Sequence, residues 1–528
     1  MPDYKLAILT AGAGSRLGAL GGEINKGLLP LKHKAVISHI IDKFPEDIEI
    51  VVVVGHKKDL LKEYLSIAHP ERNFSYVEVD KLTGPGSGPG YSLLKAKEQL
   101  QCPFVLSAVD TVVSEYVPRP TVNWLGVSPV DDTARFNSIK IKDGFVADMK
   151  DKVKCDNTHA DIGLSGINDY ELFWRTLEAD RTLIDGELQI SNGLKALMES
   201  PDKLCAVEFT WFDTGTPESY EAARRVFDKS QEEFDFSKTN EFTYFAGDRV
   251  IKYVKDPRRV DLLFRRAKIL EGFVPQIDEK GEHFISYKKI YGHLMHEEMN
   301  DGRALSLLAW LKNSFWEKAN LPDSGKKEFS DACRSFYEKN TFDRVQDYWN
   351  ITGKNDGPSV VNGSEVPPLS ELLKKVDWGY VADGIPSRFH GNLNLDNVLV
   401  IENAQQPFLF LGWGTDFAGL VDYGDLYYDL AALYGGMILP YNLIRKNMFS
   451  FKEENGEVSF DVPSSYSFMS VRKLYEEFLS DEGYDLNKIK MITALLFINM
   501  SPLHKEPFNF LLHYLGKLEL SRFFDKQT

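Results

Sequence analysis

The stretch "KLAILTAGAGSRLG", residues 5–18, decides the fold of the N-terminal part of the chain. It begins with a short apolar run of the kind that forms a buried strand, and a glycine-rich turn follows directly. Strand-like and helix-like segments then alternate up to "FVLSAVD", residues 104–110. This order predicts an α/β fold with a doubly wound, mostly parallel, Rossmann-like sheet, because parallel strands are joined by helical crossovers.

The size and composition of the chain predict a protein of more than one domain. Its 528 residues are too many for a single core. The net charge of −16 argues against nucleic acid as a partner, because Lys and Arg must neutralise the phosphates. The four cysteines form no CxxC pair, so neither a zinc site nor a disulfide framework is indicated. No signal peptide and no apolar run of ~20 residues is found, so we expect a cytoplasmic protein without membrane insertion.

Two domains are expected, at residues 1–230 and 241–528. The polar stretch "DKSQEEFDFSKTN", residues 228–240, is a candidate linker between them. A further strand-like run, "DRVIKYVKD", opens the second domain, and a long helical region follows. Two segments rich in turn residues, 352–368 and 452–465, are expected to interrupt that region as loops.

The glycine-rich turn after the first strand is a candidate phosphate site. Small residues let backbone N–H groups approach a phosphate, and Arg16 adds a cationic fork. Leu17 stands where a dinucleotide fingerprint needs its last glycine, and a plain strand-to-helix turn would also explain the glycines. Lys26, ten residues on, is a second cation that can reach the same place. The candidate nucleotide-binding residues of the turn are Ala11, Gly12, Ala13, Gly14 and Ser15.

Two aspartates strengthen the case for a triphosphate site. Asp110 ends an apolar strand, and Asp213 follows another strand-like run in "WFDTGTPESY". Ligands of such sheets bind beyond the carboxyl ends of the strands, where the first turn and Asp110 should meet. A pair of carboxylates there can hold Mg²⁺ on a triphosphate. Taken singly, each aspartate is also typical of a helix N-cap or a turn.

The segments "AGAGSRLG", "LLPL" and "DTGTPESY" together resemble those of the sugar-phosphate nucleotidyltransferases, or NTP transferases. The resemblance covers roughly residues 4–227. It implies that the glycine-rich turn, Arg16 and Lys26 bind the nucleotide phosphates, and that Asp110 and Asp213 hold Mg²⁺. Arg16, Lys26 and the two aspartates would be the catalytic residues. It also suggests base contacts for Gly88 and Gly90 and a substrate-phosphate contact for Lys152. Asn25 departs from the family's usual proline.

The C-terminal half resembles the aminoglycoside phosphotransferase and choline kinase family in "HGNLNLDNVLV", "FLFLGWGTDFAG" and "YGDLYYDLA". The resemblance implies an α+β, protein-kinase-like fold. Two departures indicate a catalytically degenerate domain, a pseudokinase. Asn392 stands where the family has its catalytic aspartate, and Gly412 where it has a metal-binding aspartate. The residues of this degenerate site are Lys252, His390, Asn392, Asn397 and Gly412.

The sequence therefore predicts a nucleotidyltransferase that couples an NTP to a phosphorylated sugar or small polar alcohol and releases pyrophosphate, with Mg²⁺ as cofactor. By resemblance, such enzymes supply precursors for capsule and other surface glycans, and the choline-kinase-like half favours CTP. One alternative is a bifunctional enzyme whose second domain still phosphorylates the alcohol. Another is a binding or regulatory protein without turnover, which the intact Arg16, Lys26, Asp110 and Asp213 disfavour. Whether the chain forms a homo-oligomer is left open.

Overall fold

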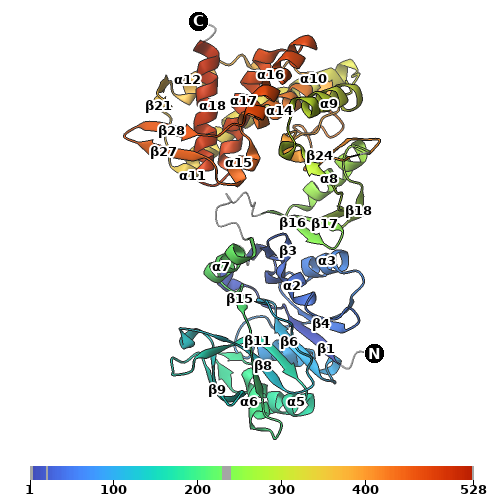
Figure 1. Ribbon diagram of the computed structural model, residues 1–528, viewed down its shortest axis with the longest axis vertical. Helices are drawn as coiled ribbons and strands as arrows, with labels where there is room; N and C mark the ends of the chain where they lie inside the picture. The colour runs from blue at the N-terminus through green and yellow to red at the C-terminus, as the bar shows by residue number, and fades with distance from the viewer. Residues whose placement is uncertain (1–3, 19–21, 229–239, 403, 526–528) are drawn as a thin grey trace. The chain divides into compact units, whose positions relative to one another are not determined.

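The computed structural model describes residues 4–18, 22–228, 240–402 and 404–525 (Figure 1). The described residues divide into two compact units. The first contains the chain up to Asp228 together with Glu241–Tyr253, and the second contains the chain from Val254 onward. The boundary lies within β17 (Arg249–Val254). Most of the predicted linker at 228–240 lies outside the described residues.

The first unit is built on a nine-stranded sheet of order β5-β4-β1-β6-β11-β8-β14-β10-β9. Its first four strands are parallel, with Leu6 opposite Ile50 and Val105. They are β1 (Lys5–Leu9), β4 (Glu49–Val54), β5 (Asn73–Glu78) and β6 (Phe104–Ala108). This half of the sheet agrees with the predicted crossovers, because α2 (Val36–Ile41), α3 (Lys58–Ala68) and α4 (Pro89–Lys95) lie between the strands in sequence.

The other half of the sheet is mixed, so the prediction of a mostly parallel sheet is wrong there. Strand β11 runs antiparallel to β6 and β8, β10 runs antiparallel to β9 and β14, and only β14 and β8 pair in parallel. The strands are β8 (Trp124–Pro129), β9 (Asn137–Lys142), β10 (Phe145–Asp151), β11 (His159–Ile167) and β14 (Cys205–Glu208). Asp143 and Gly144, both at positive φ, join β9 to β10. Such a two-residue turn makes its strands antiparallel.

Hydrophobic residues cover both faces of this sheet. Ala7 and Val51 pack with residues of α4, α5 (Tyr170–Ala179) and α6 (Ser191–Glu199) in one cluster. Leu6 and Ile50 are also fully buried. They face the other side, because successive side chains of a strand alternate between faces.

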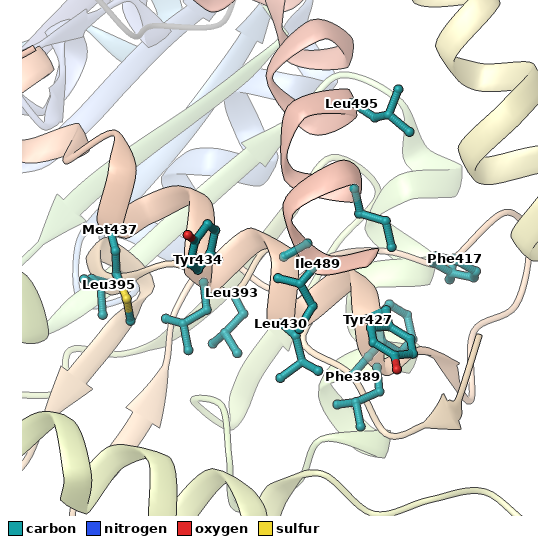
Figure 2. Close-up of a cluster of buried hydrophobic side chains, with 14 of the residues drawn as sticks. Phe389, Leu393, Leu395, Phe417, Tyr427, Leu430, Tyr434, Met437, Ile489 and Leu495 are labelled. Atoms are coloured by element: carbon teal, nitrogen blue, oxygen red, sulfur yellow. The ribbon is translucent and has the colours of Figure 1, made fainter. Parts of the chain in front are cut away.

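The second unit has a mostly helical core. Its helices include α14 (Leu426–Ile438), α16 (Tyr466–Asp481), α17 (Leu486–Met500) and α18 (Phe508–Asp525). Figure 2 shows Leu430 and Met437 of α14 and Ile489 and Leu495 of α17 in the core, together with Phe389, Leu393 and Leu395 of the segment 389–400. In the described ranges, no helix is both long enough and apolar enough to cross a membrane.

The two segments expected to be loops within the helical region form a sheet instead. They supply β21 (Ser359–Val361), β22 (Ser364–Val366), β27 (Ser450–Glu454) and β28 (Glu457–Asp461), in the order β22-β21-β28-β27. Each segment folds as a hairpin around an Asn-Gly turn, at 362–363 and 455–456, with all four residues at positive φ. This is the turn that two-residue hairpins favour.

Candidate functional site

The two predicted metal-binding aspartates come together at the carboxyl edge of the parallel strands. Asp110 follows β6, whose partner β1 ends beside it in register, Leu9 opposite Ala108. Asp213 ends β15 (Trp211–Asp213) and lies opposite Thr111 of β7 (Thr111–Val113). A Cβ atom at Gly215 would lie 3.0 Å from both Asp110 Oδ2 and Asp213 Oδ1. The two carboxylates therefore face one space, which a glycine leaves open.

Lys26 lies in the same place. Its Nζ is 3.0 Å from Asp110 Oδ2, and the two side chains are only 11% and 21% exposed. Lys26 begins the 3₁₀ turn Lys26–Leu28, and Asn25 caps this turn by accepting a 2.9 Å hydrogen bond from Gly27 N. The amide of Asn25 also donates to Thr10 O at 3.1 Å and to His56 O at 2.8 Å. Asn25 thereby ties the lysine turn to the end of β1, a role that a proline could not fill.

The negative charges of Asp110 and Asp213 lie close together, and this favours the binding of a cation between them. Burial raises the pKa of Asp213, and the negative charge of Asp110 raises it further. The hydrogen bond from Gly215 N and the positive charge of Arg16 oppose this rise in the pKa. Two carboxylate oxygens beside one space form a donor set that suits Mg²⁺, so the residues present fit this ion. In the described ranges, no group of three or more His, Cys, Asp or Glu forms a metal cluster.

The glycine-rich turn is open on the side where a ligand would bind. Gly14 has φ 67° and precedes the short 3₁₀ turn Ser15–Leu17, while Ser15 and Arg16 are exposed. Ala11 is buried, and its carbonyl accepts a 3.0 Å hydrogen bond from His56 N. A Cβ atom at Gly12 would meet nothing within 4 Å. Open space at this position is what the approach of a phosphate to the backbone requires.

Gly88 and Gly90 have a packing explanation in this structure. A Cβ atom at Gly88, which has φ 112°, would lie 2.7 Å from Glu187 Cβ. At Gly90 it would lie 2.8 Å from Gln189 O. The two glycines let the start of α4 approach the segment around β13 (Glu187–Leu188) closely. Base contact is therefore not needed to explain them, and it stays a prediction.

Lys152 forms an ion pair with a residue outside the cluster of Lys26, Asp110 and Asp213. Its Nζ forms a 2.8 Å ion pair with Asp185 Oδ2, and its side chain is 42% exposed. The preceding residue, Asp151, accepts a 3.1 Å hydrogen bond from Ser191 Oγ. A substrate-phosphate contact would require Lys152 to leave Asp185, and this role stays a prediction.

Sequence reasoning missed the carboxylate of Asp161 in β11. It accepts hydrogen bonds from Gly163 N at 2.8 Å and Asn137 Nδ2 at 3.1 Å. Burial raises its pKa to about 6. The neighbouring Ile162 O accepts a hydrogen bond from Thr111 Oγ1, which places this strand next to the residue that follows Asp110. Nothing in the local pattern of β11 distinguishes this aspartate from one on the surface.

Four of the five residues predicted to form a degenerate kinase site lie together in the second unit. The side-chain amide of Asn392 donates to Gly412 O at 3.2 Å, and that of Asn397 donates to Asn392 O at 2.9 Å. His390 is buried, and its Nε2 lies 3.0 Å from Leu411 O. Lys252 lies in β17, in the part that groups with the first unit.

Asp429 of α14 holds the start of the loop that contains Asn392 and Asn397. This buried carboxylate accepts the backbone N–H groups of His390 at 2.6 Å and Gly391 at 3.0 Å. Phe389, directly before the loop, and Leu395 within it are buried in the core (Figure 2). The loop conformation is therefore held by buried contacts.

The buried Asp429 predicts a pH dependence of stability. Burial raises its pKa from 3.8 to about 6, so the folded state holds this proton more tightly than the unfolded state. The group's contribution is fully present below pH 3.8 and is lost as the pH rises to 6. A shift of this size corresponds to about 3 kcal/mol. Chemical denaturation from pH 4 to 6.5 should show a smaller decline for Asp429→Asn than for the unmodified chain. Parallel curves for the two proteins would contradict this assignment.

Residues 6–125 match the family of MobA-like NTP transferase domains. The bifunctional protein GlmU of Methanococcus vannielii is 26% identical over 240 residues, which are 42% of this chain and 55% of that protein. A GlmU of Methanococcus maripaludis is 28% identical over 219 residues, 40% of this chain and 51% of that protein. The chain spans about half the length of the curated relatives it matches.

Two solved structures are similar to parts of this chain. UDP-glucose pyrophosphorylase complexed with UDP-glucose has 19% identity and a TM-score of 0.38, and the match covers 43% of this chain and 99% of that one. The CTP:phosphocholine cytidylyltransferase of Streptococcus pneumoniae has 20% identity and a TM-score of 0.36, with coverage of 42% and 99%. The predicted NTP transferase resemblance is confirmed for residues 6–125. The kinase-like resemblance of the second half stays a prediction.

Proposed function

We propose that this NTP transferase-like domain transfers a nucleotidyl group from an NTP to a phosphorylated sugar or small polar alcohol, with release of pyrophosphate. The observation that carries the proposal is the 3.0 Å contact of Lys26 with Asp110, next to Asp213 and beyond the end of β1. Cations and paired carboxylates at this edge suit a reaction between two anions. They do not suit one that needs a catalytic histidine.

The proposed chemistry needs no general base. A phosphate monoester has its second pKa near 6, so the acceptor oxygen is already ionised at neutral pH. The chain must hold two anions in line and stabilise the charge that moves to pyrophosphate. Lys26 and Arg16 supply fixed cations, and Asp110 and Asp213 would hold Mg²⁺. When bound, the ion would neutralise triphosphate charge as a Lewis acid.

The nucleotide and the acceptor define the biological role. We favour CTP as the nucleotide, because the second half resembles choline kinases. The product would be a precursor for the synthesis of capsule or another surface glycan. The test is a pyrophosphate-release screen of the full chain with Mg²⁺, four NTPs and a panel of phosphorylated sugars and alcohols. Turnover with one NTP and one class of acceptor is expected. No pyrophosphate release from any combination would refute the proposal.

Lys26→Ala should slow nucleotidyl transfer about 100-fold. The loss of a positioned cation from a partly buried anionic site removes a few kcal/mol of transition-state stabilisation. Lys26→Arg is the matched variant and should retain more activity, because it keeps the charge. Steady-state kinetics with varied NTP measures the effect. Equal activity of Lys26→Ala and the unmodified chain would exclude a role in transfer.

For the second unit we propose a ligand-holding or structural role without phosphotransfer. The amide at position 392 cannot accept a proton from a hydroxyl, and positioned base catalysis is typically worth about 10²–10⁴-fold. Glycine at 412 supplies no metal ligand. The hydrogen bond from Asn392 to Gly412 O favours this reading over a bifunctional enzyme, because an aspartate could not form it.

A further inference from the structure

A strand from beyond the matched NTP transferase region contacts the turn that carries Lys26. This strand is β16 (Glu241–Ala246). Tyr244 in its middle is fully buried, and its hydroxyl donates a 2.6 Å hydrogen bond to Leu28 O. Leu28 is the last residue of the 3₁₀ turn that Lys26 begins. A residue 216 positions away thus holds the far end of the lysine turn.

Other contacts fix the position of Tyr244. Its ring packs edge to face against Tyr64, with the centroids 5.1 Å apart. The next residue, Phe245, donates its backbone N–H to His33 O at 2.6 Å, and its ring packs against the His33 ring at 5.1 Å. The tyrosine is held by both its ring and its backbone, so its hydroxyl is a rigid support.

The lysine turn is supported from both sides. At its start, Asn25 caps Gly27 N and reaches the end of β1. At its end, Tyr244 holds the Leu28 carbonyl, and Tyr220 of α7 (Pro217–Asp228) donates to Pro30 O at 2.7 Å. A 3₁₀ turn of three residues has few hydrogen bonds of its own. These outside contacts therefore fix the position of the Lys26 backbone, from which its side chain extends.

We propose that Tyr244 is a positioning residue for nucleotidyl transfer and acts by fixing the turn that aims Lys26 at Asp110. The assignment of Lys26 to nucleotidyl transfer rests on the proposed function. The hydrogen bond from Tyr244 to Leu28 O does not depend on that function. The strand that follows the predicted linker is then a working part of the transfer domain, and a boundary drawn at residue 230 would remove it.

The test compares Tyr244→Phe with Tyr64→Phe in the full chain. Each variant loses one buried hydroxyl from the same aromatic cluster, but the Tyr64 hydroxyl bonds Ser38 Oγ of α2 at 2.9 Å, whereas the Tyr244 hydroxyl bonds the lysine turn. Both should lose similar thermal stability. Only Tyr244→Phe should lower kcat, about tenfold, with the acceptor KM unchanged. Equal kcat in the two variants would overturn the proposal.

A second readout does not depend on activity. Competitive amine labelling, read by mass spectrometry, reports how accessible the Lys26 amine is, with the 55% exposed Lys140 as internal reference. The rate at Lys26 should rise at least threefold in Tyr244→Phe and stay unchanged in Tyr64→Phe. An unchanged rate in Tyr244→Phe would refute positioning. If labelling responds but the unmodified chain transfers no nucleotide, the proposed function fails and the positioning contact stands.

Discussion

Asp110→Ala is expected to reduce nucleotidyl transfer roughly 10³-fold while the first unit stays folded. The variant removes one of the two carboxylates that face the space beside Gly215 and also the partner of Lys26. A metal ion that neutralises transferred charge is worth several kcal/mol, and each 1.4 kcal/mol is about a factor of ten in rate. Pyrophosphate release at saturating NTP and Mg²⁺ measures the loss.

Two matched variants separate metal binding from the ion pair. Asp148→Ala removes a 41% exposed carboxylate from the same unit and should leave activity unchanged. Asp110→Asn keeps the shape of the side chain but weakens it as a metal ligand, so half-maximal activity should need more Mg²⁺. If Asp110 served only to hold Lys26, Asp110→Asn and Lys26→Ala would lose equal activity with no change in the Mg²⁺ requirement. Full activity of Asp110→Ala would refute the site.

The candidate site in the first unit could be predicted from the sequence to the extent that the geometry of parallel strands determines it. The turn after β1 and Asp110 after β6 had to meet, because parallel strands end at the same edge of a sheet. Asn25 and Tyr244 were not predictable in the same way. Their hydrogen bonds to Thr10 O and Leu28 O depend on how distant segments pack, and neither residue stands in a motif.

The parts of the fold that were predicted wrongly share one signal. Asp143-Gly144, Asn362-Gly363 and Asn455-Gly456 are two-residue turns with both residues at positive φ. These dipeptides are the strongest short-range indication of a hairpin. The segments 352–368 and 452–465 are rich in turn residues and favour loops, and the alternation of strands and helices up to residue 110 favours a parallel sheet. In the first unit this signal accounts for the β9–β10 hairpin, whereas the antiparallel pairing of β11 with β6 and β8 has no such local signal.

In the second half, the segments that resemble the phosphotransferase family predict which residues meet but not the conformation of the loop. Asn392, Asn397 and Gly412 are in contact, as their motif positions suggest. Gly412 has φ 62°, and a Cβ atom there would lie 2.9 Å from Asn397 Oδ1. The loop is therefore built around an amide at 392 and a glycine at 412. The contacts of Asn392 and Gly412 depend on the backbone conformation of the loop, which could not be predicted from the amino-acid sequence.

The unmodified chain is expected to transfer no phosphate from ATP or GTP to choline, ethanolamine, polyols or sugars. Asn392 supplies no base and Gly412 no metal ligand, and the proposed nucleotidyl-transfer residues Lys26, Asp110 and Asp213 belong to the first unit. Radiolabelled ATP and GTP with each acceptor give the most sensitive measurement. Asn397→Ala is the control, since any true turnover at this loop should disappear in it. Phosphotransfer abolished by Asn397→Ala would establish the bifunctional alternative.

Introducing aspartate at both positions, as Asn392→Asp with Gly412→Asp, is expected to destabilise the second unit by about 2 to 4 kcal/mol. The aspartate at 392 cannot donate to Gly412 O and instead repels it. An aspartate at 412 must adopt the left-handed backbone conformation of Gly412, which is strained for any residue with a Cβ atom. Its side chain also pushes Asn397 away, and this breaks the 2.9 Å hydrogen bond from Asn397 to Asn392 O. Denaturation curves of the double variant and of each single variant measure the cost. A double variant as stable as the unmodified chain, with new kinase activity, would show that the loop had lost only its two carboxylates and had not been rebuilt around their replacements.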